Sequence, residues 1–392
     1  MSITDFSSRS SNVSLVNLTK KFRSLDGSGE VVAVNNINLE VKTGELVTIL
    51  GPSGCGKTTT LRMVAGFEFP TSGSIMIGGR NVAVVPPNKR GISMVFQSYA
   101  LFPHLNIYEN IAYGLRVQKQ SAAEITSRMT AILELMQLTS MQKRFPSQVS
   151  GGQQQRIALA RAIIIEPSVL LFDEPLSNLD AKLREYMRDE LRKLQKRLGI
   201  TSLYVTHDQE EAMAISDRIV IMQDGVMRQV GAPRQIYEHP ESKFVANFMG
   251  KANFVPVTVL GREGEAAIVE LEGKRLILRK PGPAAPRDGQ GTLVVRPEAV
   301  KLSAYRGAGT AGTPSGAAAG AAVDQGAAVP ALVGAIERIT YFGNIARYEI
   351  RSGNMSLLAE RYNPQAFEPH EEGESVGIDF EMDSVRVLAE EE

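Results

Sequence analysis

The sequence predicts an α/β domain with a largely parallel sheet, followed by a smaller domain made of strands. The first observation is residues 51–58, which read G-x-x-x-x-G-K-T between an apolar run and a helical pattern. The second is residues 169–172, a continuous apolar run typical of a parallel strand covered on both faces. The third is the change after Phe254, where many short alternating segments without helices indicate a small all-β barrel.

The composition of the 392 residues limits the classes of function. Lys and Arg number 43 and Asp and Glu also number 43, so no basic excess favours nucleic acid or an anionic membrane. A single cysteine excludes an internal disulfide and fits a reducing compartment. The start of the chain lacks the pattern of a secretory signal, and no run of about 18 apolar residues occurs. We therefore expect any membrane role to come through partner proteins.

The motif at residues 51–58 predicts a phosphate-binding loop, since glycines let successive backbone N–H groups point into one concave anion site. The helix that follows adds the positive end of its dipole. Lys57 can reach the β- and γ-phosphates, and the Thr58 hydroxyl can ligate Mg²⁺. The predicted nucleotide-binding residues here are Gly51, Pro52, Ser53, Gly54, Cys55, Gly56, Lys57, Thr58 and Thr59.

Cys55 lies in this loop just before a helix N-terminus, a position that favours the thiolate. We expect alkylating reagents to inactivate the protein and MgATP to protect it. The alternative is that the loop needed a small residue there and Cys55 is inert.

Two adjacent acids, Asp173 and Glu174, follow the buried strand at 169–172, at the sheet edge where open α/β sheets bind ligands. Asp173 can hold Mg²⁺, and Glu174 can polarise a water molecule for attack on the γ-phosphate. His207 ends the next predicted strand at the same edge. A lone histidine at a strand end is more often structural, but its place beside Asp173 favours a catalytic role.

A second possible anion site is Ser150, Gly151, Gly152 and Gln153, which precede a helix. It follows no strand, so taken alone it is better explained as a glycine-rich cap without a ligand. Phe22 is a further candidate, either a half-buried aromatic side chain or a stacking platform for a nucleobase.

The order of segments predicts the domain boundaries. We expect a flexible N-terminus at 1–13, the nucleotide-binding domain at 14–249 with a helical insert at about 98–165, and the barrel at 250–392. The helical insert contains a Ser121-x-x-Glu124 capping box. Residues 307–330 are almost entirely Gly, Ala, Thr, Ser and Pro, which indicates a disordered surface insert that catalysis does not need.

Taken together and in this order, the motifs resemble the ATP-binding subunit of an ATP-binding-cassette (ABC) importer. Residues 51–58 match the Walker A loop, and 169–174 match Walker B with its catalytic Glu174. In this resemblance Gln97 is the Q-loop residue and a magnesium ligand with Thr58 and Asp173, and residues 150–153 are the family signature. Asp180 lies in the D-loop (177–180), His207 is the switch histidine, and Phe22 is the A-loop aromatic. Residues 253–392, with Val295-Arg296-Pro297-Glu298, resemble the oligonucleotide-binding-like (TOBE) regulatory domain of such importers.

The resemblance implies a mixed sheet core with an antiparallel subdomain and a helical subdomain, and ATP with Mg²⁺ as ligands. It implies a head-to-tail homodimer in which each signature caps the γ-phosphate held by the other subunit. Two integral membrane permease subunits would dock near residues 97–105, where Tyr99, Leu101 and Phe102 are expected to be exposed unless they pack in the core. A periplasmic or extracellular solute-binding protein would complete the system. The protein would then lie at the cytoplasmic face of the bacterial inner membrane.

The solute is not encoded in the ATPase motifs. The C-terminal domain most resembles those of polyamine (spermidine/putrescine) and ferric-iron importers, with sulfate, phosphonate and sugar importers as alternatives. A competing hypothesis is a soluble cassette ATPase that acts on nucleic acid or ribosomes. Such proteins usually carry two cassettes, whereas this chain has one phosphate loop. Oligonucleotide binding by the barrel is disfavoured because residues 253–392 are short of aromatic side chains and end in three glutamates, so no nucleic-acid partner is expected.

Overall fold

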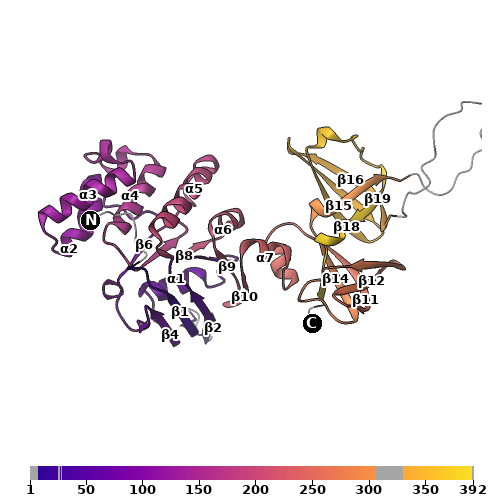
Figure 1. Ribbon diagram of the computed structural model, residues 1–392, viewed down its shortest axis with the longest axis horizontal. Helices are drawn as coiled ribbons and strands as arrows, with labels where there is room; N and C mark the ends of the chain where they lie inside the picture. Colours follow the sequence, from indigo (N-terminus) through magenta and orange to yellow (C-terminus); the bar gives the residue numbers. More distant parts are fainter. Residues whose placement is uncertain (1–7, 25–26, 28, 306–329, 391–392) are drawn as a thin grey trace, which may run out of the picture. The chain divides into compact units, whose positions relative to one another are not determined.

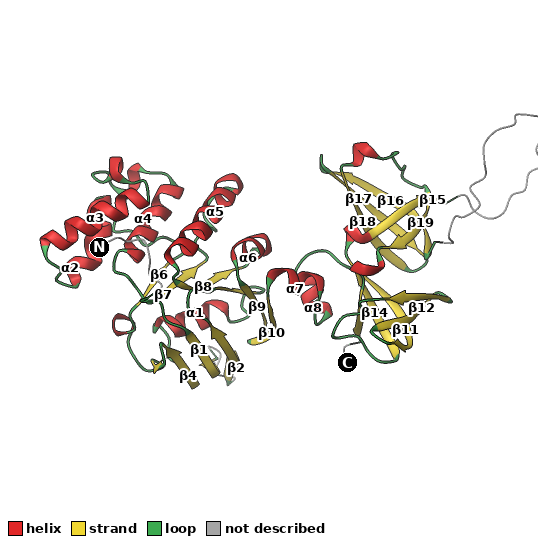
Figure 2. Ribbon diagram, viewed as in Figure 1, coloured by secondary structure: helices red, strands yellow, loops and turns green. Residues whose placement is uncertain are grey.

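The computed structural model describes residues 8–24, 27, 29–305 and 330–390. The chain forms two compact units, Met1–Ile236 and Tyr237–Glu392, which we describe separately. Figure 1 follows the chain through both, and Figure 2 shows helices and strands mixed in the first unit and mainly strands in the second. The division between the units falls within α7 (Pro233–Glu238), so α8 (Lys243–Phe248) is counted with the second unit, whereas the sequence analysis counts it with the nucleotide-binding domain. Among the described residues, no helix is long and apolar enough to cross a membrane.

The first unit is built on a six-stranded sheet of order β10-β9-β3-β8-β7-β6. All its neighbouring strands are parallel except β10, which pairs antiparallel with β9 at the edge. Because both faces are covered, β3 and β8 are buried along their whole length. The strands are β3 (Leu46–Leu50), β6 (Ile92–Val95), β7 (Val169–Asp173), β8 (Thr201–Thr206), β9 (Arg218–Gln223) and β10 (Val226–Gly231).

A four-stranded antiparallel sheet of order β2-β1-β4-β5 forms a second layer in this unit. Helix α1 (Lys57–Ala65) lies between the two sheets (Figure 1), and Leu61, Met63 and Val64 share one hydrophobic core with both. The helix starts where β3 delivers the glycine-rich loop, so core packing fixes the direction in which the loop faces. The strands are β1 (Val13–Arg23), β2 (Glu30–Val41), β4 (Ser72–Ile77) and β5 (Arg80–Asn81).

The predicted helical insert lies between β6 and β7, and its apolar side chains form a core with α5 and the far face of the sheet. Helix α2 begins at Asn106, whose Oδ1 accepts from the Glu109 N–H at 2.9 Å while Glu109 accepts from the Asn106 N–H. The Ser121 hydroxyl caps α3 by accepting from the Glu124 N–H at 3.2 Å. The helices are α2 (Ile107–Val117), α3 (Ala122–Leu135), α4 (Gly151–Ile163), α5 (Ala181–Leu198), α6 (Gln209–Ile215) and α7 (Pro233–Glu238).

The second unit consists of two five-stranded antiparallel sheets that share one hydrophobic core. One has the order β13-β12-β11-β14-β20 and the other β15-β19-β16-β17-β18. The alternating burial of β12 and β17 is the period-2 pattern on which the all-β prediction rested, and that prediction is confirmed. The strands are β11 (Asn253–Glu263), β12 (Ala266–Leu271), β13 (Lys274–Leu278), β14 (Gly289–Val295), β15 (Val300–Ala304), β16 (Leu332–Tyr341), β17 (Ile345–Ser352), β18 (Met355–Tyr362), β19 (Ser375–Phe380) and β20 (Arg386–Ala389).

Arg296 explains why α8 belongs to the second unit. Its guanidinium is buried and donates to the carbonyl of Ala246 at 2.8 Å and that of Lys251 at 3.1 Å, and it lies 4.1 Å from the centroid of the Tyr237 ring. These bonds hold the segment after α7 against β14, because a buried guanidinium must satisfy its donors locally.

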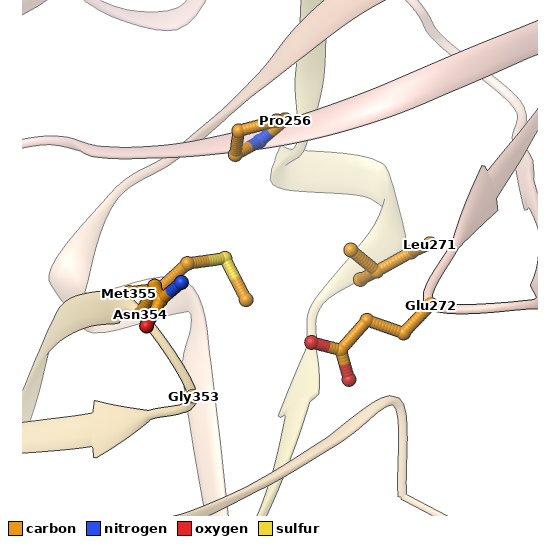
Figure 3. A pocket seen from close by; sticks show the side chains of 6 residues that line it. All are labelled: Pro256, Leu271, Glu272, Gly353, Asn354 and Met355. Atoms are coloured by element: carbon orange, nitrogen blue, oxygen red, sulfur yellow. The ribbon is translucent and has the colours of Figure 1, made fainter.

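A pocket of about 440 Å³ lies between two hairpin turns of the second unit (Figure 3). Leu271, Pro256 and Met355 give it an apolar wall, and Glu272 and Asn354 line the opening. It holds one carboxylate and none of the residues that the sequence singled out, so the candidate chemistry lies in the first unit.

Two predicted flexible segments fall partly outside the described residues. The insert at 307–330 lies outside them except for Pro330, and so do residues 1–7 of the N-terminal segment. Ser10 and Ser11, which we expected to be flexible, are instead hydrogen-bonded to the first unit: the Ser10 hydroxyl donates to the Gly199 carbonyl, and the Ser11 N–H donates to the Ser168 carbonyl.

Candidate nucleotide-binding site

The loop between β3 and α1 is shaped by its glycines and by the strands behind it. Gly54 and Gly56 have φ of +80° and +102°, in the left-handed region that favours glycine. A Cβ at Gly51 would lie 2.3 Å from the Met222 carbonyl oxygen, and one at Gly56 would lie 2.3 Å from that of Ala33. The loop is therefore seated directly on the backbone of β9 and β2.

Lys57 occupies the centre of this loop. The side chain is only 6 % exposed, and its Nζ donates to the carbonyls of Gly51 at 2.7 Å and Pro52 at 2.9 Å. These two bonds fold the loop back over the ammonium group. The positive charge is therefore fixed inside the concave turn that the sequence predicted for phosphate.

Cys55 does not have the environment that we expected from its place before a helix. The side chain is 4 % exposed, and burial raises the pKa of the thiol, a shift that the charge of Lys57 only partly offsets. The expectation of a stabilised thiolate is wrong, because removal from water outweighs the nearby positive charge.

The two predicted magnesium ligands from different elements meet at the end of the loop. The Thr58 side chain hydrogen-bonds to the carboxylate of Asp173, the last residue of β7. Burial, and then the charge of Glu174, raise the pKa of Asp173 above its usual range. A partly desolvated carboxylate beside a second acid and a hydroxyl is an oxygen donor set that fits a divalent cation. Among the described residues, no group of three or more His, Cys, Asp or Glu side chains is arranged to hold a metal ion.

Glu174 and His207 lie in contact across neighbouring strands. His207 Nδ1 is 3.0 Å from Glu174 Oε2, and the Glu174 N–H donates to the Val205 carbonyl at 3.0 Å. Glu174 has a φ of +45°, an uncommon backbone for a non-glycine residue, and such strain persists where the surroundings impose it. The structure thus brings together the two side chains that sequence analysis placed at one sheet edge.

Gln97 and the segment after it are held by Asn178, which lies in the predicted D-loop, and by Arg161, which the sequence analysis did not single out. Asn178 Nδ2 donates to the Gln97 carbonyl at 2.8 Å, which joins the segment to the loop after Glu174. Arg161 of α4 donates to the carbonyls of Tyr99 at 2.8 Å and Ala100 at 2.7 Å. The Gln97 side chain itself is exposed.

Tyr99 is buried at 5 % exposure, so its predicted place on an exposed docking face is wrong. A φ of +61° turns its ring inward against the helical core, where the desolvated side chain gains more than it would at the surface. Leu101 and Phe102 are half-buried. The Phe102 ring lies 4.6 Å from that of Tyr113, which is 44 % exposed.

Residues 150–153 form the start of α4, as predicted. Ser150 is the exposed N-cap residue, and its N–H donates to the Gln153 side chain at 3.0 Å. Gly152 is buried, and a Cβ there would lie 3.1 Å from Leu183. In the part of the chain that the structure describes, no hydrogen bond joins these residues to the phosphate loop. The two predicted anion sites are therefore not brought together within one chain.

The remaining predicted site residues lie at the surface. Asp180 is exposed and caps α5 by accepting from the Leu183 N–H at 3.0 Å. Phe22, near the end of β1, is 38 % exposed, and the Lys20 ammonium lies 4.7 Å from its ring centroid. An exposed ring beside a cation is compatible with either interpretation of Phe22 given above.

Sequence analysis also missed two charged side chains behind Glu174 and His207. Arg184 reaches the turn after β8 from α5, and Glu211 reaches it from α6. Burial raises the pKa of Glu211, although hydrogen bonds from Thr206 and Tyr204 lower it in part. The available signal was Glu211, a glutamate next to apolar positions of a helix. An acid that is buried there needs partners, because buried acids are rare unless they are paired.

Comparison with known proteins agrees with this geometry. Residues 34–177 match the ABC transporter family, and residues 293–388 match the TOBE domain family. The chain is 51% identical over 284 residues to an Fe(3+) ions import ATP-binding protein, FbpC, of Agrobacterium fabrum, covering 72% of this chain and 80% of that protein. It is 42% identical over 364 residues to a spermidine/putrescine import ATP-binding protein, PotA, of Ruegeria pomeroyi, covering 92% and 93%.

Among solved structures, the dimeric ATP-binding cassette MJ0796 in a post-hydrolysis state bound to ADP and Pi is 34% identical, with a TM-score of 0.50. The match covers 57% of this chain and 99% of that one. The matches cover most of the length of these two relatives and include residues of both units described above. The chain therefore belongs to the ATP-binding subunits of ABC importers that carry a C-terminal TOBE domain, and it hydrolyses ATP to drive transport.

Proposed function

We propose that this chain hydrolyses ATP at the interface of a head-to-tail homodimer, with the phosphate loop of one copy facing residues 150–153 of the other. The observation that carries the proposal is the contrast between the two helix starts. The loop around Lys57 is a closed cradle, while Ser150 is exposed and unconnected to it. Two copies related by a two-fold axis would make two such composite sites.

Each predicted residue has a place in this proposal. Lys57 and the loop N–H groups bind the β- and γ-phosphates, and Phe22 stacks on the base. Thr58 and Asp173 would hold Mg²⁺ with Gln97, and a bound ion would supply positive charge that offsets that of the phosphates. Glu174 polarises the attacking water, and His207 holds the Glu174 carboxylate in position. Ser150, Gly151, Gly152 and Gln153 cap the γ-phosphate of the partner, and Asp180 lies beside that interface.

The transporter assembly is proposed from the relatives. Two membrane permease subunits would dock near residues 97–105, where Leu101 and Phe102 remain half-exposed. The protein would then lie on the cytoplasmic face of the inner membrane, with a solute-binding protein on the other side. The relatives are named for Fe(3+) and for spermidine/putrescine import, so ferric iron is the first solute to test and a polyamine the second.

The dimer is tested by pairing a Lys57→Ala subunit with a Ser150→Asp subunit and measuring trapped nucleotide. Asp keeps the N-cap of α4 but places a negative charge against the γ-phosphate. If the sites are composite, the mixed dimer has one intact site and traps nucleotide that neither mutant homodimer traps. Ser150→Asn, a neutral cap, is the matched control. No more trapping in the mixed dimer than in the homodimers would contradict the head-to-tail arrangement.

The solute is tested separately, by assembling the chain with the permease and binding proteins encoded beside it. Uptake of labelled Fe³⁺ and of labelled spermidine into vesicles would be measured with the ATPase subunit and ATP inside the vesicles and the solute-binding protein outside. Uptake of spermidine and not iron would overturn the first choice of solute and leave the ATPase assignment intact.

A further inference from the structure

Arg184, one turn into α5, connects two loops of the candidate site. Its Nη2 donates to the carbonyl of Leu179 at 3.1 Å, in the loop that follows Glu174. Its Nη1 lies 3.4 Å from Asp208 Oδ2, in the turn that carries His207. The side chain is partly buried at 35 % exposure, so these contacts are shielded from much of the solvent.

The turn that Arg184 reaches is anchored from the other side by Glu211. This carboxylate is 4 % exposed and accepts from the hydroxyls of Tyr204 and Thr206. Thr206 in turn accepts from the Asp208 N–H at 3.0 Å, and Asp208 Oδ1 accepts from the Glu211 N–H at 3.0 Å. These bonds fix Thr206 and Asp208 on either side of His207 from the direction of α6.

The loop after Glu174 is short and is held at both ends. Ser177 Oγ donates to the Glu174 carbonyl at 2.9 Å, and Asp180 caps the helix that contains Arg184. Glu174, Ser177, Arg184, His207, Asp208 and Glu211 line a void of only about 10 Å³, which leaves room for one water molecule at most. Arg184 lines this void together with Glu174 and His207, so a displacement of Arg184 would change the surroundings of the Glu174–His207 contact.

We propose that Arg184 is a positioning residue that ties the loop 175–180 to the turn 206–208 and thereby keeps His207 against Glu174. The inference rests on the proposed roles of these two residues in ATP hydrolysis. Arg184 touches neither the phosphate loop nor the predicted metal ligands in the described structure, so it acts on the rate of hydrolysis and not on nucleotide binding. Its planar fork reaches both loops at once, which the single ammonium of a lysine does not.

The test is the steady-state ATPase activity of the purified full-length chain. Arg184→Ala should lower kcat about 10-fold, because a small misplacement of a catalytic group is costly, and should change KM for ATP less than about 2-fold. Arg184→Lys should recover part of the loss. Lys193→Ala, an exposed charge removal on the same helix, is the matched control and should leave kcat unchanged.

Asp208→Ser distinguishes loss of the Arg184–Asp208 contact from a loss of overall stability. Serine still caps α6 but is too short to reach Arg184, so this variant should lose about as much kcat as Arg184→Ala. The double variant should be no slower than either single variant, because both remove one interaction. Multiplied losses, an unchanged kcat, or a higher KM at unchanged kcat would each overturn the proposal.

His207→Ala, measured in parallel, distinguishes the two levels of inference. If kcat falls in His207→Ala but not in Arg184→Ala, the positioning role of Arg184 is refuted and the proposed role of His207 is retained. Full activity of His207→Ala would overturn both.

Discussion

The chain has two helix starts that contain glycines, one at α1 and one at α4, and they differ in their surroundings. The start of α1 is enclosed: Lys57 is buried and bound to two carbonyls of its own loop, and the backbone of β2 and β9 presses on the glycines. The start of α4 is open: Ser150 is exposed, and its N–H donates to the Gln153 side chain. In the dimer that we propose, the start of α1 holds the phosphates and the start of α4 of the other copy covers them.

The difference shows how a symmetric dimer can divide one site between two copies. A cradle that holds a charged ligand tightly must be preformed, because ordering a loop on binding costs free energy. A cap that closes over that ligand must arrive from outside, so it has to remain on the surface of the free chain. Four predictions test this division, from the largest effect to the smallest.

Lys57→Ala removes the charge from the enclosed start. Turnover should fall by about 10³-fold or more, because the phosphate oxygens lose a charge-assisted donor in a shielded site. ATP should also no longer raise the Tm of the variant. Normal ATP hydrolysis by a folded Lys57→Ala protein would remove the basis of the phosphate-loop assignment.

Glu174→Gln leaves both helix starts intact and blocks the chemical step. Turnover should fall about 10²-fold or more while ATP still binds, so the ATP-loaded dimer should accumulate. Size-exclusion chromatography with and without MgATP would detect it. A weaker affinity for ATP with unchanged turnover at saturation would show that Glu174 binds nucleotide and does not act on water.

Ser150→Asp alters only the open start. The homodimer should lose at least about 10-fold in turnover, because the added charge repels the phosphate. Its affinity for ATP, measured on the free subunit, should match that of the unchanged protein. Ser150→Asn should retain most activity, since it caps a helix equally well. Equal losses in both variants would indicate that the hydroxyl matters and not the charge.

The rate at which Cys55 is alkylated reports how accessible the phosphate loop at the start of α1 is to solvent. With its pKa raised by burial, the thiol carries less thiolate at neutral pH than a free cysteine, so alkylation should be at least about 10-fold slower. The labelling rate should increase with pH through a value above the ordinary cysteine pKa. Rapid labelling at pH 7 with protection by MgATP would restore the original expectation and show that the loop opens in solution.

Elements with strong local signals could be predicted from the sequence. The phosphate loop, the buried strand before Asp173 and the alternating strands of the second unit each carry a pattern within one short stretch. The meeting of Glu174 with His207 also followed, since parallel strands end at one edge.

Other features depended on contacts between distant segments. The inward turn of Tyr99 depends on a left-handed backbone held by Arg161, which lies far along the chain. Burial of Cys55 depends on packing behind the loop, which no local pattern reports. Arg184 lies in α5 and Asp208 caps α6, and neither lies in a motif of its own. Sequence patterns show what each segment does alone, and these properties arise where segments meet.

The carbonyls behind the phosphate loop have a consequence for its tolerance of mutation. Side chains at Gly51 and Gly56 would collide with Met222 and Ala33, residues that need not touch nucleotide, whereas a Cβ at Gly54 meets nothing within 4 Å. A library selected only for folded protein should therefore still reject changes at Gly51 and Gly56, and at Gly54, where the φ of +80° is the obstacle, it should admit mainly Asn or Asp. Part of what looks like selection for ATP in this motif would then be selection by the scaffold, which could hold those two glycines fixed in a descendant that had lost its ATPase activity.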